Sequence, residues 1–466
     1  MASDVPTRGL LIGGQEVPAA SGDTIEVLNP ATGQAVAHVA CAGMDDVNRA
    51  VQAGLDAFRS GVWSEMPNSE RAKVMHRFAN DIEARMEELY HLETVNNGRP
   101  VRETRAQVGR LAEWYRYNAS LLLADRTHVV PMPGPYHSYT RRYPLGVVAV
   151  LSSFNHPLMI GSKGVAPALA TGNSVILKPS EQTPLTSLLL GEIAQDSGFP
   201  PGVLNVIVGL GPVVGAGLAE HPDVAKVTFT GGTEPGRSVA VATAQRFARS
   251  TLELGGKSPV LIFDDSPLDD VVRGAAFAGF IAAGQTCIAG TRLIVQRDIH
   301  DEFVDGLVQQ ARQIRIGDPA SPDTQLGPVV SARARDRILD YVRIGVEEGA
   351  TVATGGGAAT VEGCEDGFFV EPTVLVDLRN DMRVAQEEIF GPVLVVIPFD
   401  DESEAIAMAN DSPYGLGSAI WTRDVARAHR VASKLQTGIV WVNDHHRLDP
   451  SSPWGGVKDS GMGREG

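Results

Sequence analysis

The pattern of apolar and polar positions differs between about the first 130 residues and the rest of the chain. Residues 10–40 alternate between apolar and polar side chains and are interrupted by Gly and Pro, which predicts short antiparallel strands. Apolar residues then recur every three or four positions over residues 47–58 and 74–89, and residues 101–123 make a third stretch of this kind. This spacing predicts three amphipathic helices.

After a proline-rich turn at residues 131–135, the strands become almost continuously apolar. Such runs are typical of strands that are buried on both faces of a parallel sheet. Helical segments separate them, and the first of these begins at Thr183-Pro184 and ends near Gly198. Alternation of this kind predicts an α/β protein with two doubly wound lobes that meet near residue 255. The first series of strands is predicted at 147–151, 175–177, 203–208 and 227–229; the second is predicted at 260–263, 293–296, 393–397, 418–421 and 439–442, with helices at 298–314, 331–348, 402–410 and 422–435.

Composition narrows the classes of partner. With 466 residues, 43% hydrophobic and 21% charged, the chain resembles a soluble globular protein of two or three domains. Its formal net charge of −16 disfavours nucleic acids and anionic membranes as partners. The three cysteines, Cys41, Cys287 and Cys364, form no disulfide framework, which fits a reducing cytoplasm. Cysteine and histidine do not occur at zinc-binding spacing, so no metal site is predicted.

Cys287 stands in the sequence Gly-Gln-Thr-Cys-Ile-Ala-Gly, at the end of a stretch without charge from residue 274 to residue 291. Small neighbours allow a cofactor or a substrate to approach the thiol closely. Taken alone, a buried structural cysteine is the commoner explanation. A membrane-spanning helix is the other alternative, and the glycines of the stretch together with Gln285 and Thr286 argue against it.

Seven short stretches occur in a fixed order along the chain, and one of them contains Cys287. They are FNHP at 154–157, KPSE at 178–181, FTGGTE at 229–234, LELGGK at 252–257, GQTC at 284–287, EEIFGP at 387–392 and PWGG at 453–456. Together they resemble the aldehyde dehydrogenase superfamily, in its non-acylating branch, from about residue 10 onward. The resemblance implies an NAD-binding domain (1–120 and 145–254), a catalytic domain (255–444), and oligomerisation or bridging segments (121–144, a small antiparallel flap, and 445–466, with a short C-terminal tail).

Oxidation of an aldehyde by hydride transfer requires an oxyanion, which a thiolate creates when it adds to the carbonyl. By resemblance, Cys287 is the nucleophile, and the Asn155 amide and the Cys287 N–H stabilise the oxyanion. Glu253 is the expected base that activates water for thioester hydrolysis, with its pKa raised by burial. From the residues alone, Asn155 could be a turn residue and Glu253 a cap or an ion-pair partner. Because the CoA-acylating branch lacks the base, Glu253 favours a free acid as product.

The resemblance also implies an NAD site, although the chain has no Gly-x-Gly-x-x-Gly after the first strand of its α/β lobe. A helix that opens at Gly231 should present its N-terminal amides to the pyrophosphate. Glu181 should accept from the adenosine ribose and repel a 2′-phosphate, which favours NAD and leaves NADP possible. Glu388 should hold the nicotinamide ribose, with Phe390 beside the ring. The expected cofactor residues are Phe154, Lys178, Ser180, Glu181, Gly231, Gly232, Gly236, Leu254, Glu388 and Phe390.

His156, Arg110 and Arg447 are the candidate substrate residues, and they would suit a polar aromatic aldehyde or a semialdehyde. A solvated surface role is the open alternative for each of them. The family has a lysine nine residues after the oxyanion asparagine, where this chain has Gly164 preceded by Lys163, while Glu465 matches a late glutamate of the family. The relay that these residues form in relatives is therefore in question here.

The sequence thus predicts an NAD-dependent aldehyde dehydrogenase that forms a carboxylic acid through a thiohemiacetal and a thioester on Cys287. We expect a homodimer or homotetramer that acts on a small-molecule aldehyde. The alternatives are CoA-acylating or esterase activity on the same scaffold, and a non-catalytic structural relative.

Overall fold

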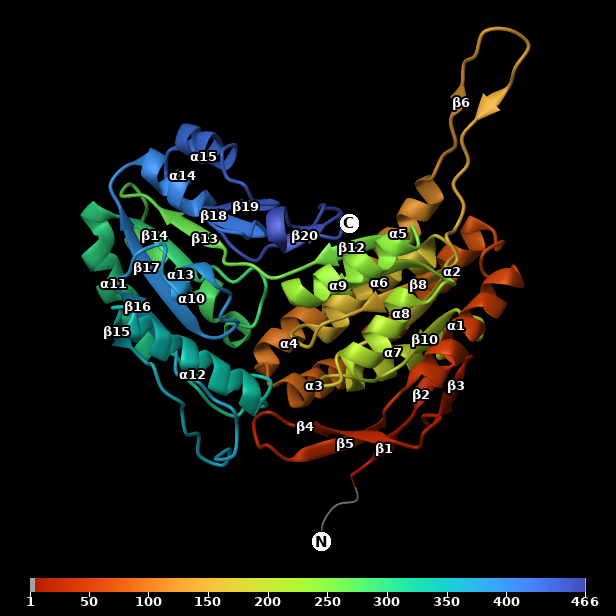
Figure 1. Ribbon diagram of the computed structural model, residues 1–466, viewed down its shortest axis with the longest axis horizontal. Coiled ribbons are helices and arrows are strands. Elements are labelled where there is room, and N and C mark those ends of the chain that lie inside the picture. Colours follow the sequence, from red (N-terminus) through yellow and green to blue (C-terminus); the bar gives the residue numbers. More distant parts are fainter. Residues whose placement is uncertain (1–4, 466) are drawn as a thin grey trace.

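Two large mixed sheets dominate the computed structural model, which describes residues 5–465 (Figure 1). Strands from the first half of the chain form most of one sheet, and strands from the second half form the other. This arrangement confirms the predicted α/β class with two lobes. Among the described residues, no helix has both the length and the apolar composition that are needed to cross a bilayer.

The first large sheet has the order β20-β12-β11-β8-β9-β10-β2-β3, and its five central strands are parallel. Every residue of β8 and β9 is buried, as expected for strands that helices cover on both faces. The strands are β2 (Leu10–Ile12), β3 (Gln15–Val17), β8 (Val147–Leu151), β9 (Ser174–Lys178), β10 (Leu204–Val206), β11 (Val224–Thr230), β12 (Arg249–Glu253) and β20 (Gly461–Met462). The helices of this half are α1 (Met44–Arg59), α2 (Asn68–Ala84), α3 (Met86–Asn97), α4 (Val101–Val108), α5 (Leu111–Ala124), α6 (Pro157–Ala170), α7 (Leu185–Asp196), α8 (Ala216–Glu220) and α9 (Thr233–Gln245), with a π-helical turn at Gly211–Gly215.

The second large sheet has the order β15-β16-β17-β14-β13-β18-β19, and only β15 is antiparallel. Its strands are β13 (Pro259–Ile262), β14 (Arg292–Gln296), β15 (Thr351–Thr354), β16 (Thr373–Val376), β17 (Val393–Phe399), β18 (Gly417–Trp421) and β19 (Ile439–Val442). Its helices are α10 (Leu268–Phe280), α11 (Arg297–Arg312), α12 (Ala332–Glu347), α13 (Arg383–Gln386), α14 (Glu402–Asn410) and α15 (Val425–Ala432), with 3₁₀ turns at Ile281–Gly284 and Lys458–Ser460.

Two small sheets complete the fold. β1 (Thr7–Arg8), β5 (Ala35–Ala40) and β4 (Thr24–Leu28) form one of them below the first lobe (Figure 1). β6 (Val129–Val130) and β7 (Ser138–Tyr139) form a flap that stands away from the body of the molecule (Figure 1). The proline-rich segment 131–135 lies in the turn of this flap. The predicted small antiparallel flap is therefore confirmed.

Three helices differ from their predicted limits. The stretch 101–123 is not one helix, because it breaks at Gly109-Arg110 into α4 and α5. The stretch 74–89 breaks at Arg85, whose φ of −106° and ψ of 17° leave the helical range. In both cases tertiary packing, rather than helix propensity, sets where the helix breaks. Helix α2 packs along α5, whereas α3 packs along α4 and α7. The last helix, predicted at 422–435, begins only at Val425, because the Asp424 side chain caps α15, and it ends at Ala432.

Candidate active site

The backbone that follows β12 brings three of the predicted site residues together. Glu253 ends β12, and Gly255 and Gly256 come directly after it. A Cβ atom on Gly255 would lie 2.2 Å from Glu388 Oε2, and one on Gly256 would lie 2.7 Å from the Cys287 carbonyl oxygen. The Gly256 N–H donates to Glu388 Oε1 at 2.9 Å. Only glycines allow the strand end that carries Glu253 to approach both partners so closely.

Cys287 follows a tight reversal of the chain at the end of α10. Ala282, Ala283 and Gly284 all have left-handed backbones, with φ of 53°, 53° and 70°. For alanine this conformation costs about 1–2 kcal/mol per residue, so surrounding contacts must hold it. The Gln285 side chain provides one such contact, because its Oε1 accepts from the Val330 N–H at 3.0 Å. Cys287 itself is half-buried and is not in a disulfide.

Asn155 lies between β8 and α6, directly against the Cys287 loop. Its Nδ2 donates to the Gln285 carbonyl oxygen at 2.8 Å, and its Oδ1 accepts from Ser153 Oγ at 2.6 Å. The residue is buried, and the amide nitrogen carries a second hydrogen that can donate to another acceptor. The structure therefore places the predicted oxyanion donor beside the loop of the predicted nucleophile. Sequence reasoning did not assign Gln285 this linking role.

The Glu253 carboxylate is buried, and neither of its oxygens has a hydrogen-bond partner among the described residues. Burial and the nearby Glu465 carboxylate raise the pKa of Glu253 to about 9, against the opposing effect of the Lys163 ammonium. Burial also raises the pKa of the Cys287 thiol to about 12, and the Lys163 charge again acts in the opposite direction. Lys163 is thus the cation that moderates both groups.

Lys178 and Glu181 lie at the carboxyl end of β9. Lys178 Nζ is 3.2 Å from Glu181 Oε2, and burial lowers the pKa of this ammonium. Ser180 Oγ accepts from the Gln182 N–H at 3.3 Å, which shapes the turn between β9 and α7. The acidic side chain predicted to face a ribose therefore stands at the strand ends, where α/β folds bind ligands.

The glycine-rich segment after β11 opens helix α9. The Gly231 N–H donates to the Glu253 carbonyl oxygen at 3.1 Å, and Gly232 is the N-cap residue, so no side chain caps the helix. Gly236 packs against Leu254, since a Cβ there would lie 2.4 Å from Leu254 Cδ2. The N-terminus of α9 thus lies beside the strand end that carries Glu253.

Glu388 and Phe390 lie on a loop that α12 supports. The Arg337 guanidinium donates to the Glu388 and Ile389 carbonyl oxygens, both at 2.6 Å. The rings of Phe154 and Phe390 meet edge to face, with centroids 5.6 Å apart. Burial raises the pKa of Glu388 to about 7. Nearby, burial lowers the pKa of Lys257 to about 7, and its Nζ has no hydrogen-bond partner among the described residues.

The structure brings only one of the three predicted substrate residues next to this group. His156 follows Asn155; its Nδ1 lies 3.0 Å from Gln107 Oε1, and burial lowers its pKa well below the usual value. Arg110 pairs with Glu113 at 2.8 Å and donates to the Leu448 carbonyl oxygen at 3.1 Å. Arg447 pairs with Asp444 at 2.7 Å, and its side chain is 81% exposed.

The chain is similar in sequence to a known family of enzymes. The sequence profile of the aldehyde dehydrogenase family matches residues 17–466. This chain belongs to the aldehyde dehydrogenase family. It is 42% identical to the phenylacetaldehyde dehydrogenase of Pseudomonas fluorescens, over 98% of this chain and 92% of that protein, and 40% identical to the betaine aldehyde dehydrogenase of Mesorhizobium japonicum, over 99% and 94%.

Solved structures show the same relationship. The betaine aldehyde dehydrogenase of Staphylococcus aureus, solved with NAD+, superimposes with a TM-score of 0.96 at 39% identity, over 98% of this chain and 91% of that one. An aldehyde dehydrogenase of Bacillus cereus, also solved with NAD+, gives a TM-score of 0.96 at 41% identity, over 98% and 93%. The aldehyde dehydrogenase fold predicted from the motifs is therefore confirmed.

One position sets this chain apart from the family pattern described above. A Cβ on Gly164 would lie 2.8 Å from Val150 Cγ1, so position 164 faces the sheet and has no room for a lysine. Lys163, one residue earlier on α6, lies 3.8 Å from the centroid of the Trp454 ring. Its ammonium interacts electrostatically with Glu253, Glu465 and Cys287. The lysine is thus displaced along the sequence, yet its charge still acts on the same groups.

Proposed function

We propose that this member of the aldehyde dehydrogenase family oxidises an aldehyde to a carboxylic acid, with NAD as the acceptor. The proposal rests above all on one observation: Glu388 and the Cys287 carbonyl pack against Gly255 and Gly256, which follow the strand that ends at Glu253, while Asn155 is hydrogen-bonded to the same cysteine loop. A nucleophile, an oxyanion donor and a base at one place are the parts that acyl chemistry on a cysteine requires.

In the proposed reaction, the Cys287 sulfur adds to the aldehyde carbon as a thiolate. The Asn155 amide donates to the resulting oxyanion, and it can do so without introducing a charge. NAD, when bound, supplies an acceptor for the hydride that leaves the same carbon. Cys287 then carries the acyl group as a thioester, and Glu253 takes a proton from the water that hydrolyses it.

Residues of this chain fit NAD in several respects. The uncapped N-terminus of α9 suits a pyrophosphate, because free N–H groups and the helix dipole favour negative charge. Glu181, held by Lys178, suits two ribose hydroxyls and would repel a 2′-phosphate, so we propose NAD rather than NADP. Glu388 would hold the second ribose near Phe390. Two related structures were solved with NAD+, which supports the same choice.

For the substrate, we propose a polar aromatic aldehyde in preference to a carboxylate-bearing semialdehyde. Arg110 and Arg447 each have a carboxylate partner, and the lowered pKa of His156 leaves its ring neutral near pH 7. The part of the site that the sequence predicted to be cationic therefore offers hydrogen bonds rather than a free positive charge. A related phenylacetaldehyde dehydrogenase at 42% identity supports an aromatic substrate.

Hydrolysis to a free acid is favoured over CoA acylation, because the buried Glu253 carboxylate can serve as the base for water. Esterase activity could accompany the same thioester chemistry. A purely structural role is disfavoured, because Cys287, Asn155 and Glu253 are all present and gathered at one place.

We further propose a cytoplasmic homodimer or homotetramer. The three cysteines are all unpaired, as a reducing compartment requires. The flap exposes Val129, Tyr136 and Tyr139 to solvent, and a two-stranded sheet with apolar side chains is marginal unless another surface covers it.

A screen for NADH formation tests the proposal, using aliphatic, aromatic and semialdehyde substrates with NAD and NADP in parallel. Cys287→Ala should abolish aldehyde-dependent NADH formation, whereas Cys364→Ala, in a separate small core with Ala31 and Phe369, should retain it. Full activity of Cys287→Ala would remove the nucleophile from the proposal. A product assay with and without CoA separates hydrolysis from acyl transfer.

A further inference from the structure

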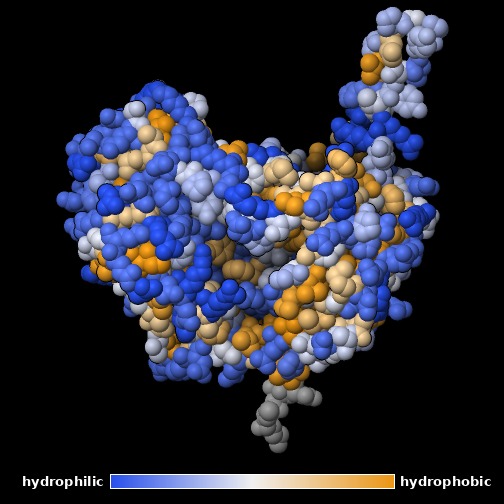
Figure 2. All heavy atoms as spheres, viewed as in Figure 1, coloured by the Kyte–Doolittle hydropathy of each residue, from blue (hydrophilic) through white to orange (hydrophobic). Residues whose placement is uncertain are grey.

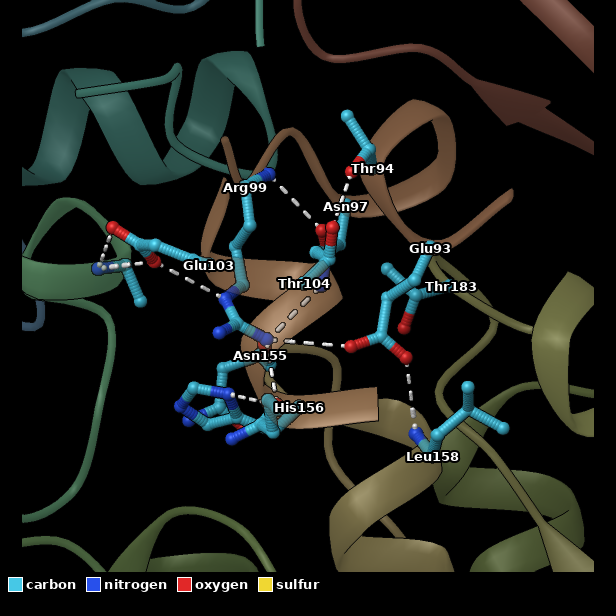
Figure 3. Close-up of polar contacts among 12 residues, drawn as sticks. Glu93, Thr94, Asn97, Arg99, Glu103, Thr104, Asn155, His156, Leu158 and Thr183 are labelled. Carbon is cyan, nitrogen blue, oxygen red and sulfur yellow. Dashed lines mark hydrogen bonds and ion pairs between the residues drawn. The ribbon is translucent and has the colours of Figure 1, made fainter. Parts of the chain in front are cut away.

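Arg99 lies between α3 and α4, at the centre of a buried polar network that reaches both sides of the site (Figure 3). Its residue is 3% exposed, and the partners Glu93 and Asn97 are as deeply buried. Neither Arg99 nor its partners belong to the residues that sequence reasoning selected. Burying a guanidinium costs desolvation free energy, which only partners of opposite charge and hydrogen-bond acceptors can offset.

One group of contacts leads to Asn155. The Arg99 backbone N–H donates to Asn97 Oδ1 at 3.0 Å, and Asn97 Nδ2 donates to the Asn155 carbonyl oxygen at 3.2 Å. Arg99 Nη1 also donates to Glu93 Oε1 at 3.3 Å, and Glu93 Oε2 accepts from the Leu158 N–H at 3.4 Å. The segment that carries Asn155 is therefore held on both sides, before and after the start of α6.

A second group of contacts leads to the Cys287 loop. Arg99 Nε lies 3.5 Å from Glu103 Oε2, and the two Glu103 oxygens accept from the Ala282 N–H at 3.1 and 3.4 Å. Ala282 is the first of the left-handed residues that turn the chain toward Cys287. Glu103 thus holds the strained end of the loop, and Arg99 interacts with Glu103 as an ion pair, in which its Nε makes no hydrogen bond to any described residue.

A third contact reaches the predicted substrate side. Arg99 Nη1 donates to Gln107 Oε1 at 2.7 Å, and the same oxygen lies 3.0 Å from His156 Nδ1. Because one guanidinium offers five N–H donors in a rigid plane, it can serve Glu93, Glu103 and Gln107 together. A lysine ammonium at this place could not point donors at all three of these side chains.

We infer that Arg99 is a positioning residue that fixes the Asn155 amide relative to the Cys287 loop. The inference rests on the proposed function, since it concerns how the nucleophile and the oxyanion donor are aligned. A misplacement of reacting groups by about 1 Å can lower a rate by about 100-fold, so a residue that touches neither substrate nor cofactor can still set the rate.

Arg99→Lys is the first test, because it keeps the charge and the backbone N–H that donates to Asn97, and removes only the planar guanidinium donors. Those donors face Glu93, Gln107 and Glu103. We expect the pre-steady-state burst of NADH to slow by about 10- to 100-fold, with little change in the KM for NAD. The alkylation rate of Cys287 by iodoacetamide should change as well. Arg116→Lys, which alters an exposed pair with Glu83, is the matched control and should change neither rate.

Two further variants test the contacts to the Cys287 loop and the contacts to Asn155 separately. Glu103→Ala should alter the iodoacetamide rate, because the Ala282 N–H loses its acceptor. Asn97→Asp should slow the burst, because a carboxylate oxygen at this place cannot donate to the Asn155 carbonyl oxygen. These variants keep the inference testable if Arg99→Lys fails to fold.

Wild-type burst and alkylation rates in Arg99→Lys, or a lowered melting temperature with both rates retained, would overturn the inference and leave Arg99 a structural residue. The alkylation readout does not require turnover. Consequently, a wild-type protein that alkylates normally but oxidises no aldehyde would count against the proposed function and not against the positioning by Arg99.

Discussion

At the scale of single residues, the proposed chemistry depends on buried groups whose pKa values are shifted from their usual ones. Glu253 has no hydrogen-bond partner among the described residues, and its pKa is raised to about 9. A carboxyl group that keeps its proton near neutral pH is a weak base until the pH rises or a neighbouring charge changes. Its environment therefore controls when it can act.

Glu253→Gln should lower the rate of steady-state NADH formation by about 10²- to 10⁴-fold, because water would lose its base. The NADH burst should persist, since the thioester still forms on Cys287. If hydrolysis limits the wild type, kcat should rise as the pH approaches 9 and Glu253 loses its proton, and the variant should lack this rise. Stopped-flow measurements across pH check both points; unchanged turnover without a burst contradicts the role.

Lys163→Met should slow the alkylation of Cys287 at a given pH. The ammonium lowers the pKa of the thiol, so without it less thiolate is present. The rate of iodoacetamide modification measures this directly. Lys73→Met, which removes an exposed partner of Glu70, is the control; equal rates in both variants would deny Lys163 this effect.

The residue types of the site could be predicted from the sequence, whereas several orientations could not. Cys287, Asn155 and Glu253 belong to stretches whose order along the chain identified them. The structure places Asn155 against the Cys287 loop, and Gly256, three residues after Glu253, against the Cys287 carbonyl. The directions of Arg110 and Lys163 depend on how α5 and α6 pack, and no local pattern encodes that. The sequence identified Lys163 as the residue before Gly164, and only the structure shows that its charge acts on Glu253, Glu465 and Cys287.

At the scale of elements, the loop before Cys287 shows how backbone strain and close packing act together. Gly284 has a φ of 70°, and a Cβ there would lie 2.1 Å from the Gly391 carbonyl oxygen. The Cys287 loop and the loop that carries Glu388 and Phe390 therefore touch through their backbones. A change in one loop must shift the other.

Gly284→Ala should abolish activity and lower stability by more than the roughly 1–2 kcal/mol of left-handed strain, because the Gly391 carbonyl must also move. Gly363→Ala is the matched control: Gly363 has a φ of 76°, but nothing lies within 4 Å of an added Cβ. The control should lose stability but keep its activity. Urea denaturation and NADH assays distinguish the two, and active Gly284→Ala would show that the loops move independently.

Several strands were predictable because they are buried along their whole length. β8, β9 and β13 are apolar runs, and burial on both faces explains why the runs are uninterrupted. β20 could not be predicted, because it has only two residues and exists through pairing with the distant β12. The break at Arg85 could not be predicted either, because α2 and α3 continue the same apolar periodicity.

At the scale of the whole molecule, the two lobes and the flap suggest how copies associate. Figure 2 shows a surface that is hollowed between the lobes, and a flap that projects from the body with apolar patches. Val129 is 64% exposed and Tyr139 is 63% exposed on this flap. Such side chains on an isolated pair of strands favour contact with a second surface.

Val129→Asp should weaken self-association, because a charge would be buried at the contact without a partner. Native mass spectrometry and sedimentation of the wild type should show a dimer or tetramer, which this change shifts toward smaller species. Val425→Asp, on α15 and 70% exposed, should leave the mass unchanged. A monomeric wild type would remove the flap from this role.

The pairing of β20 with β12 has a consequence for biosynthesis. Leu252 and Glu253 are bordered by Met462 and Gly461, which a ribosome adds long after the strands at the centre of that sheet. Until those late residues arrive, the nascent polypeptide exposes an unpaired strand edge at Glu253, the proposed base, and contacts of such sequence separation form slowly. The protein should therefore acquire its catalytic competence last, and chaperones that shield bare strand edges should matter most during that interval.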